Sequence, residues 1–320
     1  MDFSKKNILL LTDGSEGMIS QVEGLAQQFN NSYTFIKTEI LFPWSKLQPG
    51  FLPTFFWSFK NKLDLSFNPD IIISCGRKSV YLSLFLKKKY KNVVNIHIQN
   101  PKINFKSFDY IISPKHDNIK GKNVLESIGA IHKFNSKLFD NILDKNFDLP
   151  INNLITVILG GSNNHYRFSL KESEILISNI INLINKNSKY NFLILHSRRT
   201  SKETKKLLFK KLKGKAYIWQ EEDLNPYGFS LKHSDFFIVT SDSTSMISEC
   251  AYTGKPIYVY ELPLKRNSKR IQRFHDQFKN LNITKKLNEI KELTEWNYKT
   301  LNESERIASI IKERIIKEKS

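Results

Sequence analysis

Short apolar runs alternate with amphipathic stretches along the whole chain, and this alternation constrains the fold most. Short apolar runs are typical of buried strands, whereas apolar residues three or four positions apart are typical of one helix face. Strands that alternate with helices predict βαβ units and a parallel sheet. In the first half, strands are expected at Asn7–Thr12, Tyr33–Ile40, Asp70–Cys75, Val93–Gln99 and Tyr110–Ser113, and helices at Gln21–Phe29, after Phe55 and at Ser79–Tyr90.

A second series of the same kind follows a linker. The helical pattern Lys133–Phe147 leads into Asp148–Asn153, whose Pro and Asn residues indicate a connection between domains. Strands are then expected at Leu154–Leu159, Tyr190–His196, Ala216–Trp219, Phe236–Thr240 and Pro256–Tyr260, and helices at Lys171–Asn185, Glu203–Leu212, Met246–Tyr252 and Asn302–Lys317. We therefore predict an α/β fold of two Rossmann-like domains that face a cleft, residues 1–150 and 151–320, with a final helix that can cross back to the first domain.

The charge of the chain is strongly positive. The net charge is +19, from 50 Lys and Arg against 31 Asp and Glu. Codon bias of an AT-rich genome, attraction to an anionic membrane surface and nucleic-acid binding are three explanations. No basic block is interleaved with stacking aromatics, so we expect no nucleic-acid partner.

An aromatic segment, Leu41–Phe59, is either a packed loop and helix start or a peripheral membrane contact. It contains Trp44, Phe55, Phe56 and Trp57, with lysines at its borders. No apolar run approaches the roughly 20 residues that span a bilayer.

The start of the chain lacks a signal-peptide pattern, and Cys75 and Cys250 form no disulfide framework or metal-binding pair. We expect a cytoplasmic protein, with contact to the inner membrane as an option.

Polar loops after the expected strands are the candidate functional elements, because parallel sheets bind ligands at the carboxyl ends of their strands. In the first domain, Asp13-Gly14-Ser15-Glu16-Gly17 follows a strand and precedes a helix. Its glycines permit close approach of a ligand, and the helix start presents free N–H groups to an anion. A plain Asp-Gly turn that caps a helix is the alternative, and no Gly-x-Gly-x-x-Gly motif occurs.

Two further loops belong to the second domain. Gly160-Gly161-Ser162 is a candidate phosphate cradle of backbone amides, and His165 and Arg167 follow within reach of a diphosphate. Arg198 and Arg199 come directly after another strand, where guanidinium groups are suited to bidentate phosphate binding. Solvated side chains or a basic helix start are the alternatives.

The most informative loop begins at Thr240. A hydroxyl-rich stretch, Ser241 to Ser245, opens a helix that contains Met246 and Glu249. Helix-start amides are suited to phosphates, and the Glu249 carboxylate to ribose hydroxyls. Ser and Thr caps with a Gly-Lys-Pro helix stop would explain much of the pattern as structure alone.

Together these motifs resemble the bacterial relatives of the ELM-type mitochondrial fission family, whose members are treated as GT-B-like glycosyltransferases. The resemblance covers nearly the whole chain. It rests on Asp13-Gly14 with Gly17 and Gln21, Ser74-Cys75-Gly76-Arg77-Lys78, Gln99-Asn100-Pro101, Ser113-Pro114-Lys115-His116-Asp117, Asn123-Val124-Leu125 with Gly129-Ala130, Gly160-Gly161 with His165-Tyr166, Ser197-Arg198-Arg199-Thr200, Thr240-Ser241-Asp242-Ser243 with Ser245-Met246 and Glu249, and His275-Asp276-Gln277-Phe278. The family usually has His and Asn where this chain has Met18 and Ser20, and often Asp-Pro-Arg where it has Asn100-Pro101-Lys102.

The resemblance implies a metal-independent transferase that moves a sugar from a nucleotide-sugar donor to a lipid-linked or cell-envelope saccharide. Asp13 is the expected general base, ahead of Glu16, His97 and His116. Substrate contacts are expected from Gly14, Gly17, Gln21, Gly76, Arg77, Gln99, His116, Gly160, Gly161, Ser162, His165, Arg167, Arg198, Arg199, Thr240, Ser241, Ser243, Ser245, Met246 and Glu249. No Asp-x-Asp pair occurs, so no metal site and no cofactor are expected.

Two other functions fit the same residues. A non-catalytic adaptor would use the surface of the fold to bind protein or membrane, although it would not need polar strand-end loops. A nucleotide-sugar epimerase would share the nucleotide site and need acid and base groups on both faces of the sugar.

Overall fold

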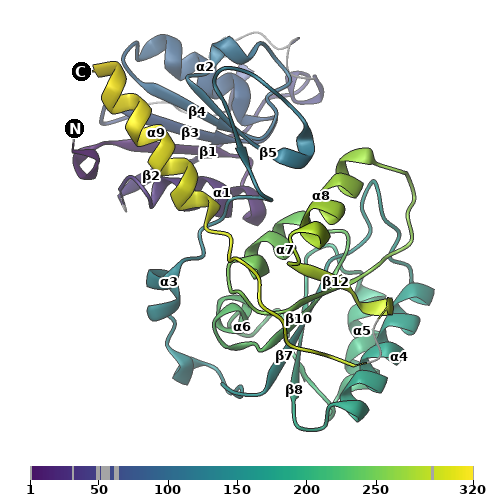
Figure 1. Ribbon diagram of the computed structural model, residues 1–320. Helices are drawn as coiled ribbons and strands as arrows, with labels where there is room; N and C mark the ends of the chain where they lie inside the picture. The colour runs from purple at the N-terminus through teal and green to yellow at the C-terminus, as the bar shows by residue number, and fades with distance from the viewer. Residues whose placement is uncertain are drawn as a thin grey trace. The chain divides into compact units, whose positions relative to one another are not determined.

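The structure is a computed structural model that describes residues 2–30, 32–47, 51, 58–60, 65–289 and 292–319. The chain divides into two units, Met1–Lys133 with Asn302–Ser320, and Phe134–Leu301 (Figure 1). Each unit contains one six-stranded parallel sheet flanked by helices. The predicted α/β fold of two Rossmann-like domains is confirmed.

The first sheet has the strand order β2-β1-β3-β4-β5-β6. Its strands are β1 Ile8–Thr12, β2 Tyr33–Lys37, β3 Ile71–Cys75, β4 Val94–Ile98, β5 Tyr110–Pro114 and β6 Val124–Ser127, and its flanking helices are α1 Glu16–Ala26 and α2 Ser79–Lys89. Strand β1 is buried along its full length because Leu10 packs on the α1 side and Leu9 and Leu11 pack on the α2 side. Burial of both faces explains why the central strands are continuous apolar runs.

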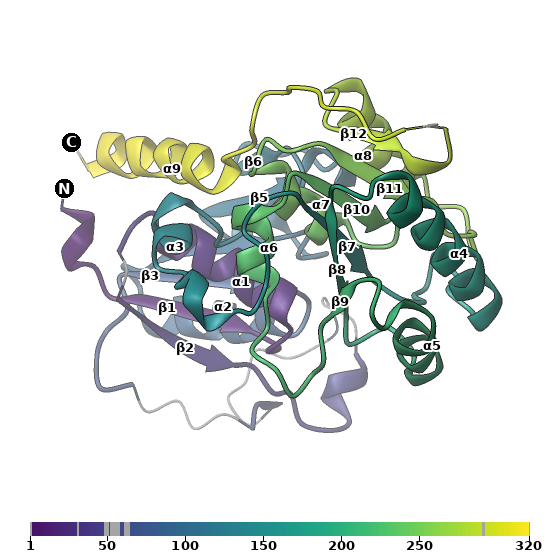
Figure 2. The same cartoon turned by 90° about the horizontal axis from the view of Figure 1, so that it is seen from below.

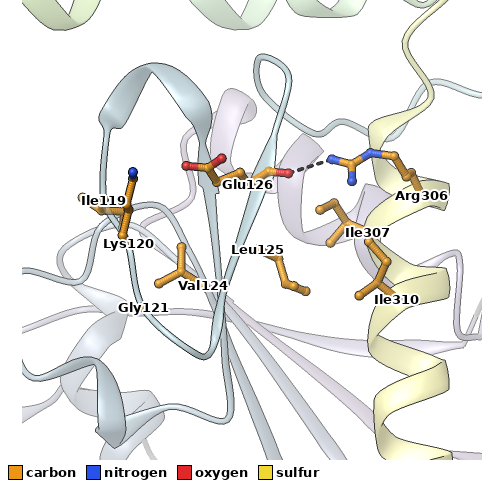
Figure 3. Close-up of a pocket in the computed structure, with 9 residues that line it drawn as sticks. All are labelled: Ile119, Lys120, Gly121, Val124, Leu125, Glu126, Arg306, Ile307 and Ile310. Carbon is orange, nitrogen blue, oxygen red and sulfur yellow. Dashed lines mark hydrogen bonds between the residues drawn. The ribbon is translucent and has the colours of Figure 1, made fainter.

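The last helix, α9 Glu303–Lys319, belongs to the first unit although it is last in the sequence. Its buried residues Ile307, Ile311 and Ile315 join the core on the α1 side. Figure 3 shows Arg306 and two isoleucines of α9 beside the edge strand β6, where they line a groove of about 330 Å³. The Arg306 Nη2 donates to the main-chain oxygen of Glu126 at 2.7 Å, and the Ile128 N–H donates to Glu303 at 2.7 Å. Side chains of α9 thus satisfy backbone groups at the sheet edge.

The second sheet has the strand order β12-β11-β10-β7-β8-β9. Its strands are β7 Leu154–Leu159, β8 Asn191–His196, β9 Tyr217–Ile218, β10 Phe236–Thr240, β11 Ile257–Tyr260 and β12 Thr284–Lys286. Its helices are α4 Leu170–Lys186, α5 Lys202–Leu212, α6 Tyr227–His233, α7 Thr244–Ala251 and α8 Lys269–Asn280. Helices α4 and α5 pack side by side (Figure 2), and α4 starts with a capping box of Ser169 and Glu172.

The segment after residue 133 differs from the sequence prediction. One helix was expected at Lys133–Phe147, but the chain forms α3 Ser136–Asp140 and a 3-10 helix, η6 Asp144–Asn146. Asn135 caps α3 at its start, and extended backbone at Leu143 separates α3 from η6. The rings of Phe134 and Tyr227 lie 5.6 Å apart. Such contacts place residues 134–150 in the second unit, whereas the predicted boundary was residue 150.

Other differences concern elements that were not expected. Strands β6 and β12 and helix α6 are short and contain few apolar residues. Helix α8 was missed although Ile271, Phe274 and Phe278 recur at helical spacing. The helix expected after Phe55, and Phe55, Phe56 and Trp57 themselves, fall outside the described residues. Trp44 is half-buried against the α2-side core. Within the described part of the chain, no helix has the length and apolar character needed to cross a membrane.

Candidate functional site

The strand order of the second sheet reverses between β7 and β10. The chain runs from β7 to β8 and β9 on one side, and then returns to β10 on the other side of β7. In open α/β sheets, ligands bind outside the carboxyl ends of the strands at such a switch point. The loops predicted to bind phosphate follow β7, β8 and β10, so the sheet gathers them at this edge.

Asp242 connects these three loops. Its Oδ2 accepts hydrogen bonds from the Gly161 N–H at 3.0 Å and from Arg199 Nη2 at 2.5 Å, and its Oδ1 accepts one from the Thr240 hydroxyl at 2.7 Å. The Asp242 side chain is 0% exposed. The Thr200 hydroxyl also donates to the Gly160 carbonyl at 2.5 Å. A buried carboxylate that accepts this many hydrogen bonds holds the loops together.

Gly160 and Gly161 are required for close packing. An added Cβ on Gly160 would lie 2.1 Å from Asp242 Oδ2, and one on Gly161 would lie 2.1 Å from the Arg199 carbonyl. The Gly160 N–H donates to the Thr240 hydroxyl at 2.8 Å. Both glycine amides are therefore engaged within the protein, in contrast to the free amides expected of a phosphate cradle. The Ser162 hydroxyl similarly accepts from the Phe168 N–H at 2.8 Å.

The start of α7 retains free backbone donors. Ser243 is its N-cap, and its hydroxyl accepts from the Met246 N–H at 3.4 Å. The N–H groups of Thr244 and Ser245 have no hydrogen-bond partner in the part of the chain that the structure describes. Unpaired amides and the helix dipole give this turn a partial positive charge. Ser241, by contrast, accepts from the Leu262 N–H at 3.0 Å and anchors the loop after β11.

Glu249 lies farther along α7 and is 7% exposed. Its Oε2 accepts a hydrogen bond from the Tyr227 hydroxyl of α6 at 2.5 Å. Burial, and then the charge of Glu249, raise the pKa of Tyr227 well above its usual range, so this hydroxyl keeps its proton and remains a donor. The tyrosine fixes the position of the carboxylate.

The remaining predicted residues of the second unit lie on its surface or in loop turns. Arg167 and Arg198 are exposed, and the Arg199 side chain is 36% exposed while it pairs with Asp242. The His165 N–H donates to Asn163 Oδ1 at 2.7 Å, which fixes the turn before β-bridge residue Tyr166. Arg199 is thus neutralised by Asp242, whereas Arg167 and Arg198 lie exposed on their loops.

The strand order of the first sheet reverses between β1 and β3. Asp13 directly follows β1, is half-buried, and accepts from the Ser15 N–H at 3.1 Å through Oδ1. Gly14 has φ of +85°, a conformation that favours glycine. Glu16 is exposed at the first position of α1. The Gly17 carbonyl accepts from Gln21 Nε2 at 2.8 Å.

Gln21, Gln99 and Cys75 come together from α1 and the ends of β4 and β3. The Gln21 Oε1 accepts from Gln99 Nε2 at 3.5 Å and from Cys75 Sγ at 3.9 Å. Burial, with a smaller contribution from the nearby Asp13 charge, raises the pKa of the Cys75 thiol, which stays protonated. Gly76 has φ of +84°, and its added Cβ would lie 2.5 Å from the Met18 sulfur. Met18 thus closes over Gly76.

Arg77, His116 and His97 contact other residues of the first unit. Arg77 is exposed, and its Nη2 donates to the Ser45 carbonyl at 3.4 Å. His116 is buried, with Nε2 3.6 Å from Asp117 Oδ1. His97 is buried within β4 beside Ser74, and burial lowers its pKa to about 3. His97, a lower-ranked candidate for the general base, is thus a neutral core residue.

Residues 16–315 match the family described as Mitochondrial fission ELM1. The chain belongs to this family.

A relative of this ELM1-family protein is the uncharacterized protein RP120 of Rickettsia prowazekii, 31% identical over 96% of this chain and 98% of the relative. Among solved structures, the UDP-GlcNAc 2-epimerase of Methanocaldococcus jannaschii in complex with UDP-GlcNAc and UDP has a TM-score of 0.51, 15% identity, and coverage of 96% of this chain and 99% of that chain. The glycotransferase of kitacinnamycin has a TM-score of 0.54, 11% identity, and coverage of 88% and 86%. The ELM1-family fold is thus the GT-B-like fold of nucleotide-sugar epimerases and glycosyltransferases.

Sequence reasoning missed two residues of the candidate site as individual contributors. Asp242 was visible within the Ser-Asp-Ser motif, but only the fold shows that it meets Gly160 and Arg199. Tyr227 lies in a segment where no element was expected. Among the described residues, no three His, Cys, Asp or Glu side chains are grouped as a metal site would require. The roles of the predicted site residues toward a ligand stay predictions.

Proposed function

We propose that this ELM1-family protein is a metal-independent glycosyltransferase. It binds a nucleotide-sugar donor on its second unit and transfers the sugar to a lipid-linked or cell-envelope saccharide. The GT-B-like fold supports this proposal, and the UDP-GlcNAc and UDP in the related epimerase structure favour a uridine nucleotide as the first donor to test.

The observation that carries the proposal is the combination of free amides and a buried carboxylate on one helix, α7. The N–H groups of Thr244 and Ser245 would bind the diphosphate, because helix starts favour anions. Glu249 would accept hydrogen bonds from the ribose hydroxyls, with its orientation set by Tyr227. Arg198, which is exposed, would add positive charge.

The glycine loop has a supporting role in this proposal. Gly160 and Gly161 allow Asp242 and Arg199 to approach, so that the β10 loop is held in one conformation. A site held rigidly before the ligand arrives loses less entropy on binding. Asp242 is thus a positioning residue rather than a ligand contact.

The catalytic base would come from the first unit. Asp13 is half-buried at the end of β1, and its hydrogen bond to the Ser15 N–H orients the carboxylate. Glu16, exposed one turn later, is the second candidate. Because the sequence has no Asp-x-Asp pair, arginines and helix-start amides would neutralise the leaving diphosphate.

Two specific observations favour other functions. The solved epimerase shares the fold over nearly the whole chain, which supports a nucleotide-sugar epimerase as the second candidate. The family description, together with Phe42 at 73% and Phe51 at 79% exposure, supports an adaptor that binds protein or a membrane surface. Whether the protein acts as a transferase or as an adaptor, we propose that it is cytoplasmic and contacts the inner membrane peripherally.

Calorimetric titration of the full chain with UDP, UDP-GlcNAc and other nucleoside diphosphates, in EDTA, tests the proposal. We expect saturable binding, and a ligand at about 100 times its Kd should add about 2.7 kcal/mol to the free energy of unfolding. Absence of heat at millimolar nucleotide would refute the nucleotide site. Conversion of UDP-GlcNAc to an isomer without an acceptor would establish the epimerase instead.

A further inference from the structure

A cavity in the second unit lies beside the candidate nucleotide site. It has a volume of about 790 Å³, and its walls come from the ends of β10 and β11, the loop after β11, α8 and β12. Small-molecule sites have volumes of roughly 300–1,000 Å³, so the cavity has room for a monosaccharide-sized group. Ser241 and Tyr166 line it on the side of the candidate nucleotide site, and nothing in the proposed transferase chemistry uses the rest of it.

The lining is rich in groups that suit a polyhydroxylated ligand. Hydroxyls of Ser241 and Thr284 and amides of Asn267 and Gln272 are present, and such groups both donate and accept hydrogen bonds. Val259, Leu262 and Ile271 add apolar surface on which a sugar ring can rest.

His275 adds an acceptor to this lining. Its Nε2 lies 3.0 Å from the Ser241 carbonyl, which can only accept, so Nε2 carries the proton. Burial lowers the pKa of His275, which makes the neutral ring the expected form. In that form Nδ1 has a lone pair, and no described residue donates a hydrogen bond to it. A ligand hydroxyl is a suitable donor.

The charge of the cavity is positive. Four lysines and two acidic residues line it. Lys286 is paired with Glu261 at 3.0 Å, and Lys285 lies over the Trp296 ring at 4.1 Å from the centroid. Lys269 and Lys279 make no ion pair with any described residue. Asp276 is the remaining acidic group, and the first turn of α8, at Ser268 and Lys269, adds the positive end of a helix dipole.

From this combination we infer that the cavity is a second ligand site, which binds a monosaccharide-sized group that carries a phosphate or a carboxylate. The hydroxyls, amides and His275 bind the sugar hydroxyls, and Lys269, at the first turn of α8, binds the anionic substituent. The site is formed by the second unit alone and does not depend on nucleotide binding.

Titration calorimetry of the full chain with glucose 6-phosphate, glucuronate, glucose and inorganic phosphate tests the inference. We expect glucose 6-phosphate or glucuronate to bind at least about tenfold more tightly than either glucose or phosphate alone, a difference of about 1.4 kcal/mol. The first two probes distinguish a phosphate from a carboxylate substituent. If inorganic phosphate and glucose 6-phosphate bind with equal affinity, the cavity does not recognise the sugar. If glucose binds as tightly as glucose 6-phosphate and glucuronate, the cavity does not recognise the anionic substituent. Either result would overturn the inference.

Variants locate the binding. Lys269→Ala should weaken binding of the charged sugar about tenfold or more, whereas Lys210→Ala on the exposed side of α5 should leave it unchanged. Gln272→Leu, also at an exposed position, should weaken the charged sugar and leave inorganic phosphate unaffected. Equal effects of the α5 control and the cavity variants would overturn the assignment. The affinity for UDP, measured on the same variants, should not change, so failure here is separable from failure of the proposed nucleotide site.

Discussion

The carboxylate of Asp242 occupies the space that a side chain at residue 160 would need, since an added Cβ on Gly160 would lie 2.1 Å from Asp242 Oδ2. The two residues come from loops after different strands, β7 and β10. Glycine at this position is therefore a consequence of tertiary packing. The buried Asp242 carboxylate also accepts a hydrogen bond from the Arg199 guanidinium.

Gly160→Ala should destabilise the second unit. The methyl group would displace a buried carboxylate that is held by three hydrogen bonds, and overpacking of this kind costs about 1–3 kcal/mol. Urea unfolding measures the change. Gly228→Ala on α6 is a matched control, because its Cβ would meet only the end of the Ile142 side chain, at 3.0 Å, and alanine favours the helix. Equal stability of Gly160→Ala and the wild type would contradict the packing role.

Glu249→Gln should weaken UDP binding by about 1–3 kcal/mol, the usual cost of leaving buried polar groups without partners. Its melting temperature without ligand should change little, because the amide oxygen still accepts from the Tyr227 hydroxyl. Calorimetry with UDP and a thermal scan measure the two effects.

Tyr227→Phe is the control for this prediction, since it removes the donor but keeps the carboxylate. It should reduce UDP affinity less than Glu249→Gln does. If Glu249→Gln instead unfolds the protein while the affinity of the remaining folded fraction is unaltered, Glu249 is a structural residue and the adaptor function gains support.

Acid should destabilise the first unit through His97. The folded pKa of His97 is about 3, because of burial, whereas an unfolded histidine has a pKa of about 6.5. Between these values the unfolded chain binds one more proton, so the free energy of unfolding rises with pH by about 1.4 kcal/mol per unit for this group. This contribution is complete above about pH 6.5 and is lost as the pH falls toward 3.

Urea unfolding between pH 5 and 7 checks this sign, with His97→Gln as the comparison. Below pH 6.5, the free energy of unfolding of the variant should depend less steeply on pH, by the equivalent of about one bound proton. The imidazole resonances of His97 in the folded protein should not titrate over the same range. Identical slopes in the two proteins would show that His97 is accessible to protons.

Ile311→Ala should destabilise the first unit, although residue 311 follows the entire second unit in the sequence. Ile311 is 0% exposed in the core on the α1 side, and truncation of a buried isoleucine costs about 2–5 kcal/mol. Hydrogen exchange of the β1 amides should become faster. Glu313→Ala, on the exposed face of α9, is the control and should leave exchange unchanged. Faster exchange only in the second unit would contradict the packing of α9.

Phe42 and Phe51 should contribute to binding of anionic vesicles. Both side chains are exposed, at 73% and 79%, and Lys46 Nζ lies 5.2 Å from the Phe42 ring centroid. Burial of one such side chain supplies about 1.5–3 kcal/mol, and lysines add attraction to anionic headgroups. Phe42→Ser with Phe51→Ser should reduce pelleting, and added salt should reduce it further. Phe209→Ser on α5, exposed at 42%, is the control. Equal pelleting of all variants would leave no role for this surface.

The sequence by itself determined the βαβ series and most strands of both sheets. Strand β7 matches its expected range because Leu154–Leu159 is apolar throughout, as required of a parallel strand covered on both faces. The same reasoning located the strand-end loops and the start of α7 within a few residues. Strand β6 escaped detection because an edge strand with two apolar residues has no such signature.

Only the tertiary structure decided which groups in these loops remain free to bind a ligand. Gly160 and Gly161 have the composition of a phosphate cradle, yet their amides donate to Thr240 and Asp242. Residues this far apart in sequence meet because the strand order places β7 beside β10, and no local pattern encodes that order. Likewise the stripe of isoleucines in α9 predicts a helix, but the partner of that stripe is set by the long-range return of the chain to the first unit. Local periodicity reports burial, whereas hydrogen-bond partners depend on which strands become neighbours.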